Sequence, residues 1–318
     1  MNIGIDMMGG DYAPLEAVLG LQLYLSKSSA PATLFCIGNE PQMQSLFSQN
    51  QISPQYTRMV HAPEIIGYHE HPVKALKEKQ QSSIAIGFHL LATGKIDAFL
   101  SAGNTGAMLV GTMYTIKAIE GVLRPTISTI VPKINGATGL LLDVGLNTDC
   151  KPEQLNQFAI LGSMYAEHIL GIDKPRIGLL NVGEEEGKGN ILAQATYPLL
   201  KENTAIHFIG NIEGRDVFID KADVVVCDGF TGNVILKMAE SLYDISLQRG
   251  IENDEYMSRF HYENYGGTPV LGVGKPVIIG HGISNAKAFK NMIVAAEKMV
   301  HSNFCDTIKK AFASAVTQ

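Results

Sequence analysis

Five glycine-containing loops carry the residues whose types and spacing could bind an anion. Each begins where a short apolar run ends and leads into a helical pattern; the loops are Asp6–Pro14, Ser101–Ala107, Asp143–Asn147, Asn181–Asn190 and Cys227–Asn233. Glycine lets a ligand approach the backbone, and a helix N-terminus offers N–H groups and a partial positive charge that suit phosphate. One such loop is usually a plain strand-to-helix turn, but five of them predict an anion site.

Lys188 and Asn233 are the side chains in these loops that could act directly on an anion or on a carbonyl oxygen. Lys188 follows three acids, Glu184–Glu186, and stands between an expected buried strand and a helix. It either pairs with an anion or only neutralises those acids. Asn233 either donates a hydrogen bond to a substrate or caps its helix, a role for which asparagine is well suited.

Common nucleotide and nucleophile motifs are missing from the sequence. The stretch Gly183–Gly189 lacks the spacing of a P-loop and the Ser or Thr after its lysine, and no G-x-G-x-x-G follows an expected strand. There is no Gly-x-Ser-x-Gly elbow. His69 and His71 are weak as a metal pair without further ligands, so we expect a surface turn there. The sequence does not support nucleotide binding.

The elements that position these loops are short strands. Most are continuous apolar runs, which is typical of strands buried on both faces of a parallel sheet. We expect strands at Ile3–Ile5, Thr33–Ile37, Ala98–Ser101, Ile127–Val131, Gly139–Asp143, Arg176–Asn181, Ala205–Gly210, Asp223–Cys227 and Val277–Ile279.

Helical patterns lie between the expected strands. Apolar residues recur at helical spacing from Leu155 to Ile169, from Ile235 to Ile245 and from Phe289 to Val300. Helix faces packed on a sheet are the usual explanation for such stripes. The alternation of strands and helices predicts a doubly wound α/β fold. No linker or repeat interrupts it, so residues 1–318 are expected to form a single domain.

Charge and hydropathy exclude some partners and locations. The 318 residues carry a formal net charge of −6, which argues against nucleic acid as the main ligand. The N-terminus has no basic segment followed by an apolar run, and the uncharged stretch from Ala98 to Ile116 is too polar for a membrane span. We therefore expect a cytoplasmic protein. Glycine, at 32 residues, is in excess, and the loops contain a good part of that excess.

Taken in order along the chain, the loops resemble the bacterial phosphate acyltransferase family of phospholipid synthesis, the PlsX family. The resemblance spans nearly the whole chain. It rests on Asp6–Asp11, Pro72–Lys77 with Ser82 and Ser83, Ser101–Ala107, Arg124 with Pro125, Leu142–Gly145, Gly183–Asn190, Asn211–Asp216, Asp228–Val234, Asn264–Gly267 and His281 with Gly282.

This resemblance implies a fold and an activity. The family's fold is a Rossmann-like three-layer α/β/α sandwich with a mostly parallel sheet, related to phosphotransacetylases and to isocitrate and isopropylmalate dehydrogenases. Its members move a long acyl group from acyl carrier protein to inorganic phosphate, and a membrane acyltransferase accepts the acyl phosphate. By resemblance we expect a homodimer with no metal and no organic cofactor, held at the inner membrane face through a partner.

The implied reaction assigns roles to the loop residues. A thioester is already activated, so phosphate can attack it directly if the protein holds the anion and stabilises the oxyanion. Lys188 and Asn233 are the expected catalytic residues, for phosphate and for the thioester oxygen respectively. Asp6 and Asp11 are expected to position loops. The expected substrate-binding residues are Gly10, Asp11, Ser101, Gly103, Asn104, Thr105, Gly106, Gly187, Gly189, Asn190, Gly232 and His281. The alternative for His281 is a buried structural role.

Docking surfaces are predicted from charge. An acidic carrier protein needs a local basic surface, and the candidates are Lys74, Lys77, Lys79, Arg124 and Arg215. In the segment 246–265, where relatives often have a longer apolar and basic stretch, Glu252, Asp254, Glu255 and Glu263 outnumber Arg249 and Arg259. Because anionic lipid attracts basic clusters, this segment is not expected to dock directly on a membrane.

Three other functions stay open on the sequence. They are a short-chain phosphotransacetylase that uses acyl-coenzyme A, a metal- and nicotinamide-dependent hydroxyacid dehydrogenase that shares the fold, and a non-catalytic protein that binds a phosphate ligand.

Overall fold

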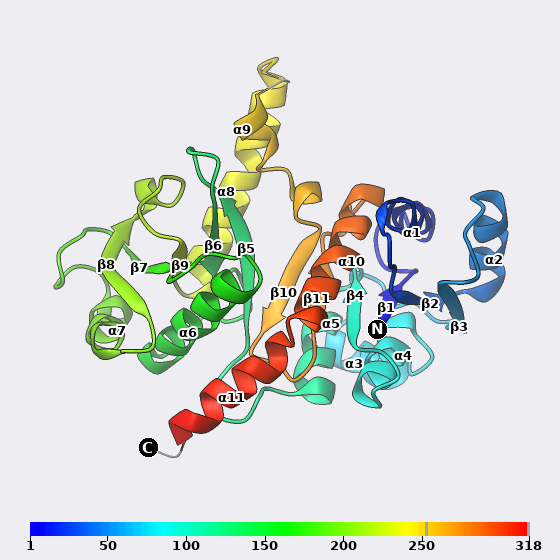
Figure 1. The fold of residues 1–318 in the computed structure, drawn as a ribbon, viewed down its shortest axis with the longest axis horizontal. Helices are drawn as coiled ribbons and strands as arrows, with labels where there is room; N and C mark the ends of the chain where they lie inside the picture. The colour runs from blue at the N-terminus through cyan, green and yellow to red at the C-terminus, as the bar shows by residue number, and fades with distance from the viewer. Residues whose placement is uncertain (252–253, 317–318) are drawn as a thin grey trace. The chain divides into compact units, whose positions relative to one another are not determined.

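The computed structural model describes residues 1–251 and 254–316, and it divides into two compact units (Figure 1). Unit 1 comprises Met1–Ile119 and Tyr262–Asp306. Unit 2 comprises Glu120–His261 and the chain from Thr307 onward. Glu252, one of the acids counted in the segment 246–265, lies outside the described residues. Each unit has a sheet with helices on it.

The sheet of unit 1 has the strand order β3-β2-β1-β4-β11-β10, and β10 runs antiparallel to β11 while the other pairs are parallel. Its strands are β1 (Asn2–Asp6), β2 (Thr33–Gly38), β3 (Thr57–His61), β4 (Ala98–Ser101), β10 (Gly267–Leu271) and β11 (Val277–Gly280). β1, β4 and β11 are almost wholly buried, because helices cover both of their faces.

Helices α1 and α10 pack side by side on one face of this sheet, and α4 packs on the other (Figure 1). The helices of unit 1 are α1 (Leu15–Lys27), α2 (Glu40–Gln49), α3 (Pro72–Glu78), α4 (Ser83–Ala92), α5 (Thr105–Gly111) and α10 (Ala286–His301), with a π-helix η1 (Thr112–Ile116) and a 3₁₀ turn η3 (Tyr262–Asn264). The predicted apolar stripe that begins at Phe289 is the buried face of α10, which confirms that expectation.

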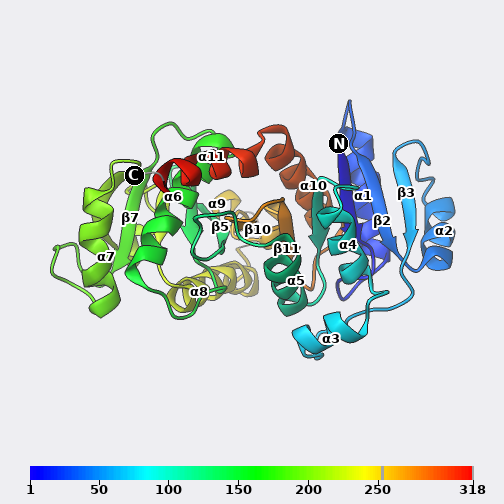
Figure 2. The same ribbon diagram turned by 90° about the horizontal axis from the view of Figure 1, so that it is seen from below.

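The sheet of unit 2 has the order β5-β6-β9-β7-β8, with only the β5–β6 pair antiparallel. Figure 2 shows α6 and α8 on opposite faces of it. Its strands are β5 (Thr126–Pro132), β6 (Thr138–Leu142), β7 (Arg176–Asn181), β8 (His207–Glu213) and β9 (Val224–Val226). Its helices are α6 (Pro152–His168), α7 (Ile191–Glu202), α8 (Gly229–Gln248) and α9 (Glu255–Ser258), with η2 (Gly214–Asp216); α11 (Phe304–Val316) ends the described chain.

The predicted α/β architecture with a mostly parallel sheet is therefore confirmed, with local differences. Two strands were not predicted: β3 because polar Arg58 and His61 interrupt its apolar pattern, and β10 because it contains Pro269, which normally argues against a strand. The expected strand Ala205–Gly210 begins later, as β8, and extends to Glu213.

Helix α8 differs most from expectation. Its apolar stripe was predicted to pack on a sheet, yet Met238 is 58 % exposed and Ile245 is 52 % exposed. Only Gly229, Gly232 and Ser246 of this helix are buried. The prediction was wrong because α8 meets the sheet mainly through the glycines of its first turn, which leaves the apolar residues further along uncovered.

None of the helices in the described ranges is both long enough and apolar enough to cross a membrane.

Candidate functional site

Three loops of unit 1 start at one edge of its sheet. β1 pairs in parallel with β4, and β4 pairs in parallel with β11, so the chain leaves all three strands on the same side. The loops that follow contain Gly10 and Asp11, Ser101–Gly106, and His281 with Gly282. The sequence predicted substrate-binding residues in each of them, and the structure brings these loops into contact within unit 1.

A buried carboxylate ties the first two loops together. Asp6, 1 % exposed, accepts a 2.6 Å hydrogen bond from the Ser101 hydroxyl and a 2.9 Å bond from the Met8 N–H. The Ser101 hydroxyl in turn accepts a bond from the Gly103 N–H at 2.9 Å. Burial raises the pKa of Asp6 despite these hydrogen bonds. Asp6 thus positions loops, as expected, and Ser101 is engaged in the same task.

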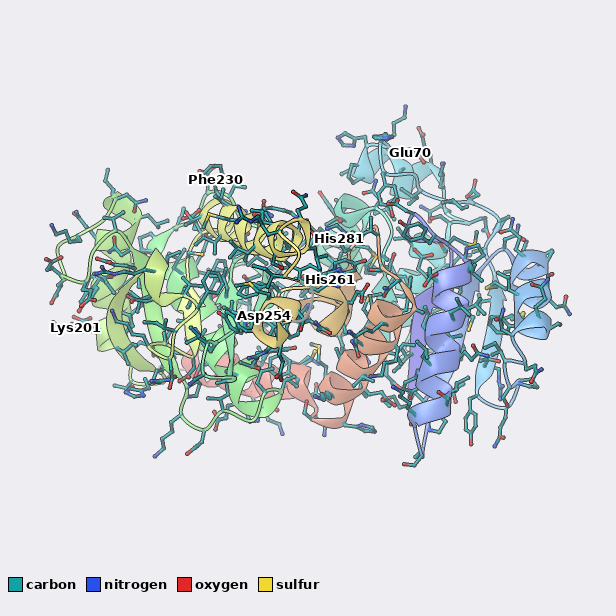
Figure 3. All side chains as sticks on the ribbon, turned by 90° about the horizontal axis from the view of Figure 1, so that it is seen from above. Glu70, Lys201, Phe230, Asp254, His261 and His281 are labelled. Carbon is teal, nitrogen blue, oxygen red and sulfur yellow. The ribbon has the colours of Figure 1, made fainter. Side chains whose placement is uncertain are left out.

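The first loop also contacts the loop after β11. The Asp11 N–H donates to the Gly282 carbonyl over 2.8 Å, and the preceding Gly10 has φ +113°, which favours glycine. His281 beside them is exposed, and its ring lies 5.3 Å from that of Tyr262 (Figure 3). The alternative of a buried structural histidine is therefore wrong for His281.

Tyr68 is a member of this cluster that sequence reasoning missed. Its hydroxyl donates to the Ala102 carbonyl over 3.1 Å, between the two glycine loops. Burial, followed by the charges of Asp11 and Asp6, raises the pKa of Tyr68 to about 12. A single tyrosine in a polar turn gives no periodic signal, so nothing in the sequence pointed to it.

Asn104 holds its own loop in place. It is 4 % exposed, caps α5 by accepting from the Ala107 N–H at 2.9 Å, and donates to the Gly67 carbonyl at 2.8 Å. Its side chain thus anchors the turn that precedes α3, while the neighbouring Thr105 is exposed. The segment from His69 to His71 is the expected surface turn, in which Glu70 accepts from Lys79 at 2.6 Å. A role for Asn104 in substrate binding stays a prediction.

In unit 2, three further loops follow neighbouring parallel strands. β9 lies between β6 and β7, so the loops after Leu142, Val226 and Asn181 leave the sheet at one edge. Asp143 organises the first of them: its carboxylate accepts from the Asn147 N–H at 2.6 Å and from the Asn147 side chain at 2.7 Å. Burial raises the pKa of Asp143 as it does for Asp6.

Lys188 lies exposed in the loop after β7. Glu184 pairs with Lys221 at 2.7 Å and Glu186 pairs with Lys201 at 2.9 Å. Across residues 1–251 and 254–316, no ion pair of Lys188 is found. The alternative that Lys188 neutralises these acids thus has no support in the geometry, and its ammonium group is available to an anion.

Side chains from neighbouring elements shape the backbone around Lys188. Asn181 donates to the Lys188 carbonyl at 3.0 Å, and Gln194 donates to the Gly189 carbonyl at 2.9 Å. Gly189 has φ +98°, and a Cβ there would overlap the Asn181 side chain. Asn190 caps α7 through the Ala193 N–H at 2.8 Å, whereas Gly187 is exposed with open space around it. These contacts fix the backbone of the loop, while Gly187 stays open to solvent.

Asn233 stands in the second turn of α8 and does not cap it. Asp228 is the cap, since its carboxylate accepts from the Thr231 N–H at 2.9 Å. Asn233 is exposed and donates one amide hydrogen to the Val144 carbonyl over 3.2 Å. A Cβ on Gly232 would overlap the Asp143 carbonyl oxygen, so this glycine permits the close approach that places Asn233 at the edge of the sheet.

The fold is one that solved phosphotransacetylases share. The chain matches a phosphotransacetylase from Streptococcus pyogenes with a TM-score of 0.66 at 16 % identity, covering 94 % of each chain. It also matches a 4-hydroxythreonine-4-phosphate dehydrogenase from Klebsiella pneumoniae with a TM-score of 0.57 at 12 % identity, covering 94 % of this chain and 97 % of the other. These likenesses establish the Rossmann-like fold.

Sequence comparison identifies the family within that class. Residues 1–249 and 251–307 match the family described as "Fatty acid synthesis protein". The chain is 43 % identical over 318 residues to the phosphate acyltransferase of Dictyoglomus turgidum, covering 94 % of each. It belongs to the phosphate acyltransferase family, and the resemblance inferred from the loops is confirmed.

Proposed function

We propose that this protein transfers a long fatty acyl group from acyl carrier protein to inorganic phosphate, for phospholipid synthesis. A phosphate oxygen attacks the thioester carbonyl carbon, the C–O bond forms and the C–S bond breaks. The carrier leaves as a thiolate that takes a proton from water, and the products are acyl phosphate and free carrier thiol. Membership in the phosphate acyltransferase family supports the reaction. No metal or organic cofactor is needed, because the thioester is already activated.

The ammonium group of Lys188, which is exposed and has no ion pair among the described residues, is the main structural support for phosphate binding at this loop. Together with the exposed backbone of Gly187, it offers phosphate a cation and a backbone N–H at the carboxyl edge of a parallel sheet. Two of the three acids beside it, Glu184 and Glu186, are paired with Lys221 and Lys201, which reduces their repulsion of an incoming anion. The expected ligand of this loop is therefore inorganic phosphate and not a nucleotide.

Asn233 is the donor we propose for the oxyanion. One of its amide hydrogens is donated to Val144, which fixes the orientation of the amide plane. A preorganised donor of this kind stabilises the charge that develops on the thioester oxygen. Gly10, Asp11, the loop Ser101–Gly106, Asn190, Gly232 and His281 stay predicted contributors to substrate binding.

Lys74 and Lys77 are the basic residues best placed to contact the carrier protein. Both are exposed on α3. Lys79 is paired with Glu70 at 2.6 Å, and Arg215 is paired with Glu213 at 2.7 Å. Because these two cations already have acidic partners, they are less available to an acidic carrier protein. Steering of an acidic partner by exposed lysines weakens with salt, so the KM for acyl carrier protein should rise with ionic strength.

The exposed stripe on α8 supports the expected homodimer. The α8 stripe (Val234, Met238, Leu242 and Ile245) forms one face of the helix, and Phe230, exposed on the first turn, extends it (Figure 3). A contiguous apolar face of this kind marks an interaction site. Met238→Glu combined with Leu242→Glu should give single chains by light scattering, whereas Lys237→Glu on the polar face should leave dimers. Single chains in the unmodified protein would contradict the dimer.

The product of the reaction indicates where in the cell the protein acts. Acyl phosphate keeps an apolar chain, so we place its consumer, an acyltransferase, in the membrane, with the present protein in the cytoplasm and peripheral to the inner membrane face. Residues 1–318, with both units, act as one catalytic domain.

The direct test of the donor is phosphate-dependent release of the carrier thiol. Purified protein with palmitoyl carrier protein should release free thiol only when phosphate is present, and palmitoyl-coenzyme A should react at least tenfold more slowly. Faster reaction with acetyl-coenzyme A than with the carrier thioester would favour a short-chain phosphotransacetylase and overturn the proposed donor.

A further inference from the structure

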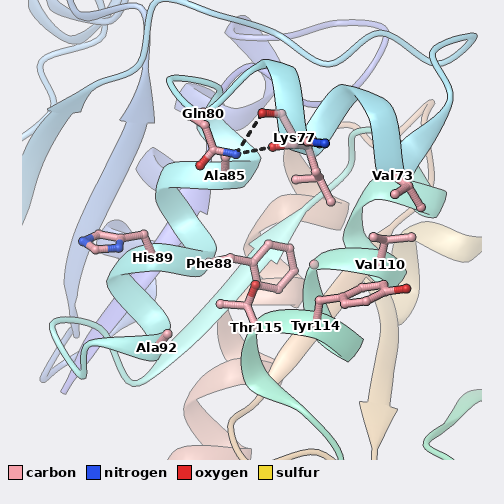
Figure 4. A pocket seen from close by; sticks show the side chains of 12 residues that line it. Val73, Lys77, Gln80, Ala85, Phe88, His89, Ala92, Val110, Tyr114 and Thr115 are labelled. Carbon is pink, nitrogen blue, oxygen red and sulfur yellow. Dashed lines mark hydrogen bonds between the residues drawn. The ribbon is translucent and has the colours of Figure 1, made fainter.

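Unit 1 contains an apolar groove that the proposed reaction does not yet use. It has a volume of about 350 Å³ and lies between α3, α4 and the continuous helix formed by α5 and η1 (Figure 4). Small-molecule sites typically measure about 300–1,000 Å³ and are mostly apolar, so the groove is large enough for an organic ligand.

Each of the three helices contributes one stripe to the groove. Residues at helical spacing face it: Val73 and Leu76 from α3, Ala85 and Ala92 from α4, and Val110 and Tyr114 from the third helix. Val73 is 47 % exposed and Tyr114 is 73 % exposed, so apolar surface faces solvent on both sides of the opening. Long apolar side chains left uncovered around a hollow indicate a binding site.

The floor of the groove is rigid. Phe88 lies buried under it and packs edge to face on Phe99, with 5.2 Å between the ring centroids. A Cβ on Gly111 would overlap the Phe88 ring, so glycine at this position lets the third helix lie directly on that ring. The π-helical turn Thr112–Ile116 follows at once, and such turns are frequent at functional sites.

The charge along the groove suits a chain that an acidic partner delivers. Lys77 and His89 line the groove with Gln80, and none of its lining residues is an acid. Lys77 is also one of the two lysines proposed to contact the carrier protein. An apolar chain attached to an acidic carrier protein therefore brings no like charges together at this groove.

The groove continues from a loop that is already predicted to bind substrate. Asn104 caps α5, and Gly106 in its first turn packs against Pro72 at the start of α3. Val110 follows Asn104 by six residues on the same helix, or about 9 Å at 1.5 Å per residue. A reactive head group at this loop thus has the groove directly beside it for an attached chain.

We propose that this groove binds the fatty acyl chain of the thioester donor, with the carbonyl end toward Asn104 and the methyl end toward Ala92. The inference rests on the proposed function, because it assigns a place to the chain of that substrate. A shallower hollow of about 670 Å³ beside Met8, bordered by Ser45 and Ile65, is the competing location.

The first test uses the absence of tryptophan from the sequence. Tyr114→Trp places a single reporter on the groove wall, Ser45→Trp places one in the competing hollow, and Ala30→Trp places one on an exposed loop of unit 1. Submicellar palmitate should shift the emission of Tyr114→Trp to shorter wavelength with saturation, and leave the other two unchanged. No response at Tyr114→Trp, or a response at Ser45→Trp instead, would overturn the assignment. This binding readout does not depend on catalysis.

The second test measures chain-length preference with octanoyl and palmitoyl carrier protein. Ala92→Trp fills the far end of the groove, so kcat/KM for the palmitoyl substrate should fall tenfold or more, since each displaced methylene costs about fourfold. The octanoyl substrate should change less than twofold, and Ala30→Trp should affect neither. Equal losses on both substrates would contradict the groove, while turnover of octanoyl carrier protein would leave the proposed function standing.

Discussion

The hydroxyl of Ser101 donates a 2.6 Å hydrogen bond to the carboxylate of Asp6, across 95 residues of sequence. This bond joins the ends of the parallel strands β1 and β4, from which two of the glycine loops depart. The loops are thereby fixed by a buried polar contact, and the backbone around them is preorganised before any ligand arrives. Asp143 has a similar role in unit 2. It directly follows β6 and fixes the loop there by accepting a hydrogen bond from the Asn147 N–H.

Ser101→Ala should destabilise the protein by about 1–3 kcal/mol, because it removes a donor from a buried carboxylate and an acceptor from the Gly103 N–H. Urea unfolding at neutral pH measures the difference. Ser26→Ala, which removes an exposed hydroxyl on α1, is the matched control and should change stability little. Equal stability of the two variants would show that the Asp6–Ser101 bond does not hold the loops.

Lys188→Ala should lower kcat/KM for phosphate by about 10²-fold or more, because it removes the cation proposed to hold the anion in a preorganised site. The KM for acyl carrier protein should change little. Steady-state kinetics with varied phosphate measure both values. Lys27→Ala removes an exposed lysine in the last turn of α1, in unit 1, and should keep activity within a few fold. Near-normal phosphate kinetics in Lys188→Ala would remove this residue from the mechanism.

Asn233→Ala should lower kcat by about 10²–10³ while leaving KM for both substrates close to normal, as expected of a donor that acts mainly in the transition state. Single-turnover rates would separate this effect from product release. Gln248→Ala removes an exposed amide from the end of the same helix and serves as the control. A rise in KM at unchanged kcat would indicate that Asn233 only binds the ground state.

The stability of unit 2 should depend on pH through Asp223. Burial raises the pKa of Asp223, but hydrogen bonds from Arg176 outweigh it and hold the pKa below its usual value. A carboxyl with a lowered pKa stabilises the fold above the ordinary value of 3.8, and that contribution is lost as the pH falls through the folded-state pKa.

Arg176→Gln should therefore be less stable than the unmodified protein by about 1–3 kcal/mol at pH 7, and the gap should narrow as the pH falls below about 4. Urea unfolding across this range measures it. Lys201→Gln breaks an exposed ion pair and should show little gap at any pH. A gap of constant size down to pH 3 would contradict the role given to Arg176 and Asp223.

Much of the fold could be predicted because buried parallel strands give continuous apolar runs. The runs at Ala98–Ser101 and Val224–Val226 are examples, and both are wholly buried. The loops could be predicted for a related reason: glycine and asparagine recur where a strand ends and a helix starts. Their order along the chain then identified the family.

Some features of the fold and of the site depend on tertiary packing, so the sequence contains no signal from which they could be predicted. The apolar stripe of α8 has the same spacing as the buried face of α10, so periodicity could not reveal that Met238 is exposed and Met292 is buried. Asn104 was expected to bind substrate, yet its side chain caps its own helix and also donates to the Gly67 carbonyl, in a turn more than thirty residues away. Tyr68 entered the cluster only through the folded position of that turn.

Formation of acyl phosphate is the reaction on which the proposed function depends. Purified protein, palmitoyl carrier protein and phosphate should be incubated with hydroxylamine, which traps an acyl phosphate as palmitoyl hydroxamate. We predict phosphate-dependent hydroxamate far above the enzyme-free control, and at least tenfold less with Lys188→Ala. Hydroxamate no greater than that control, with palmitoyl and with shorter chains alike, would contradict the formation of acyl phosphate by this protein.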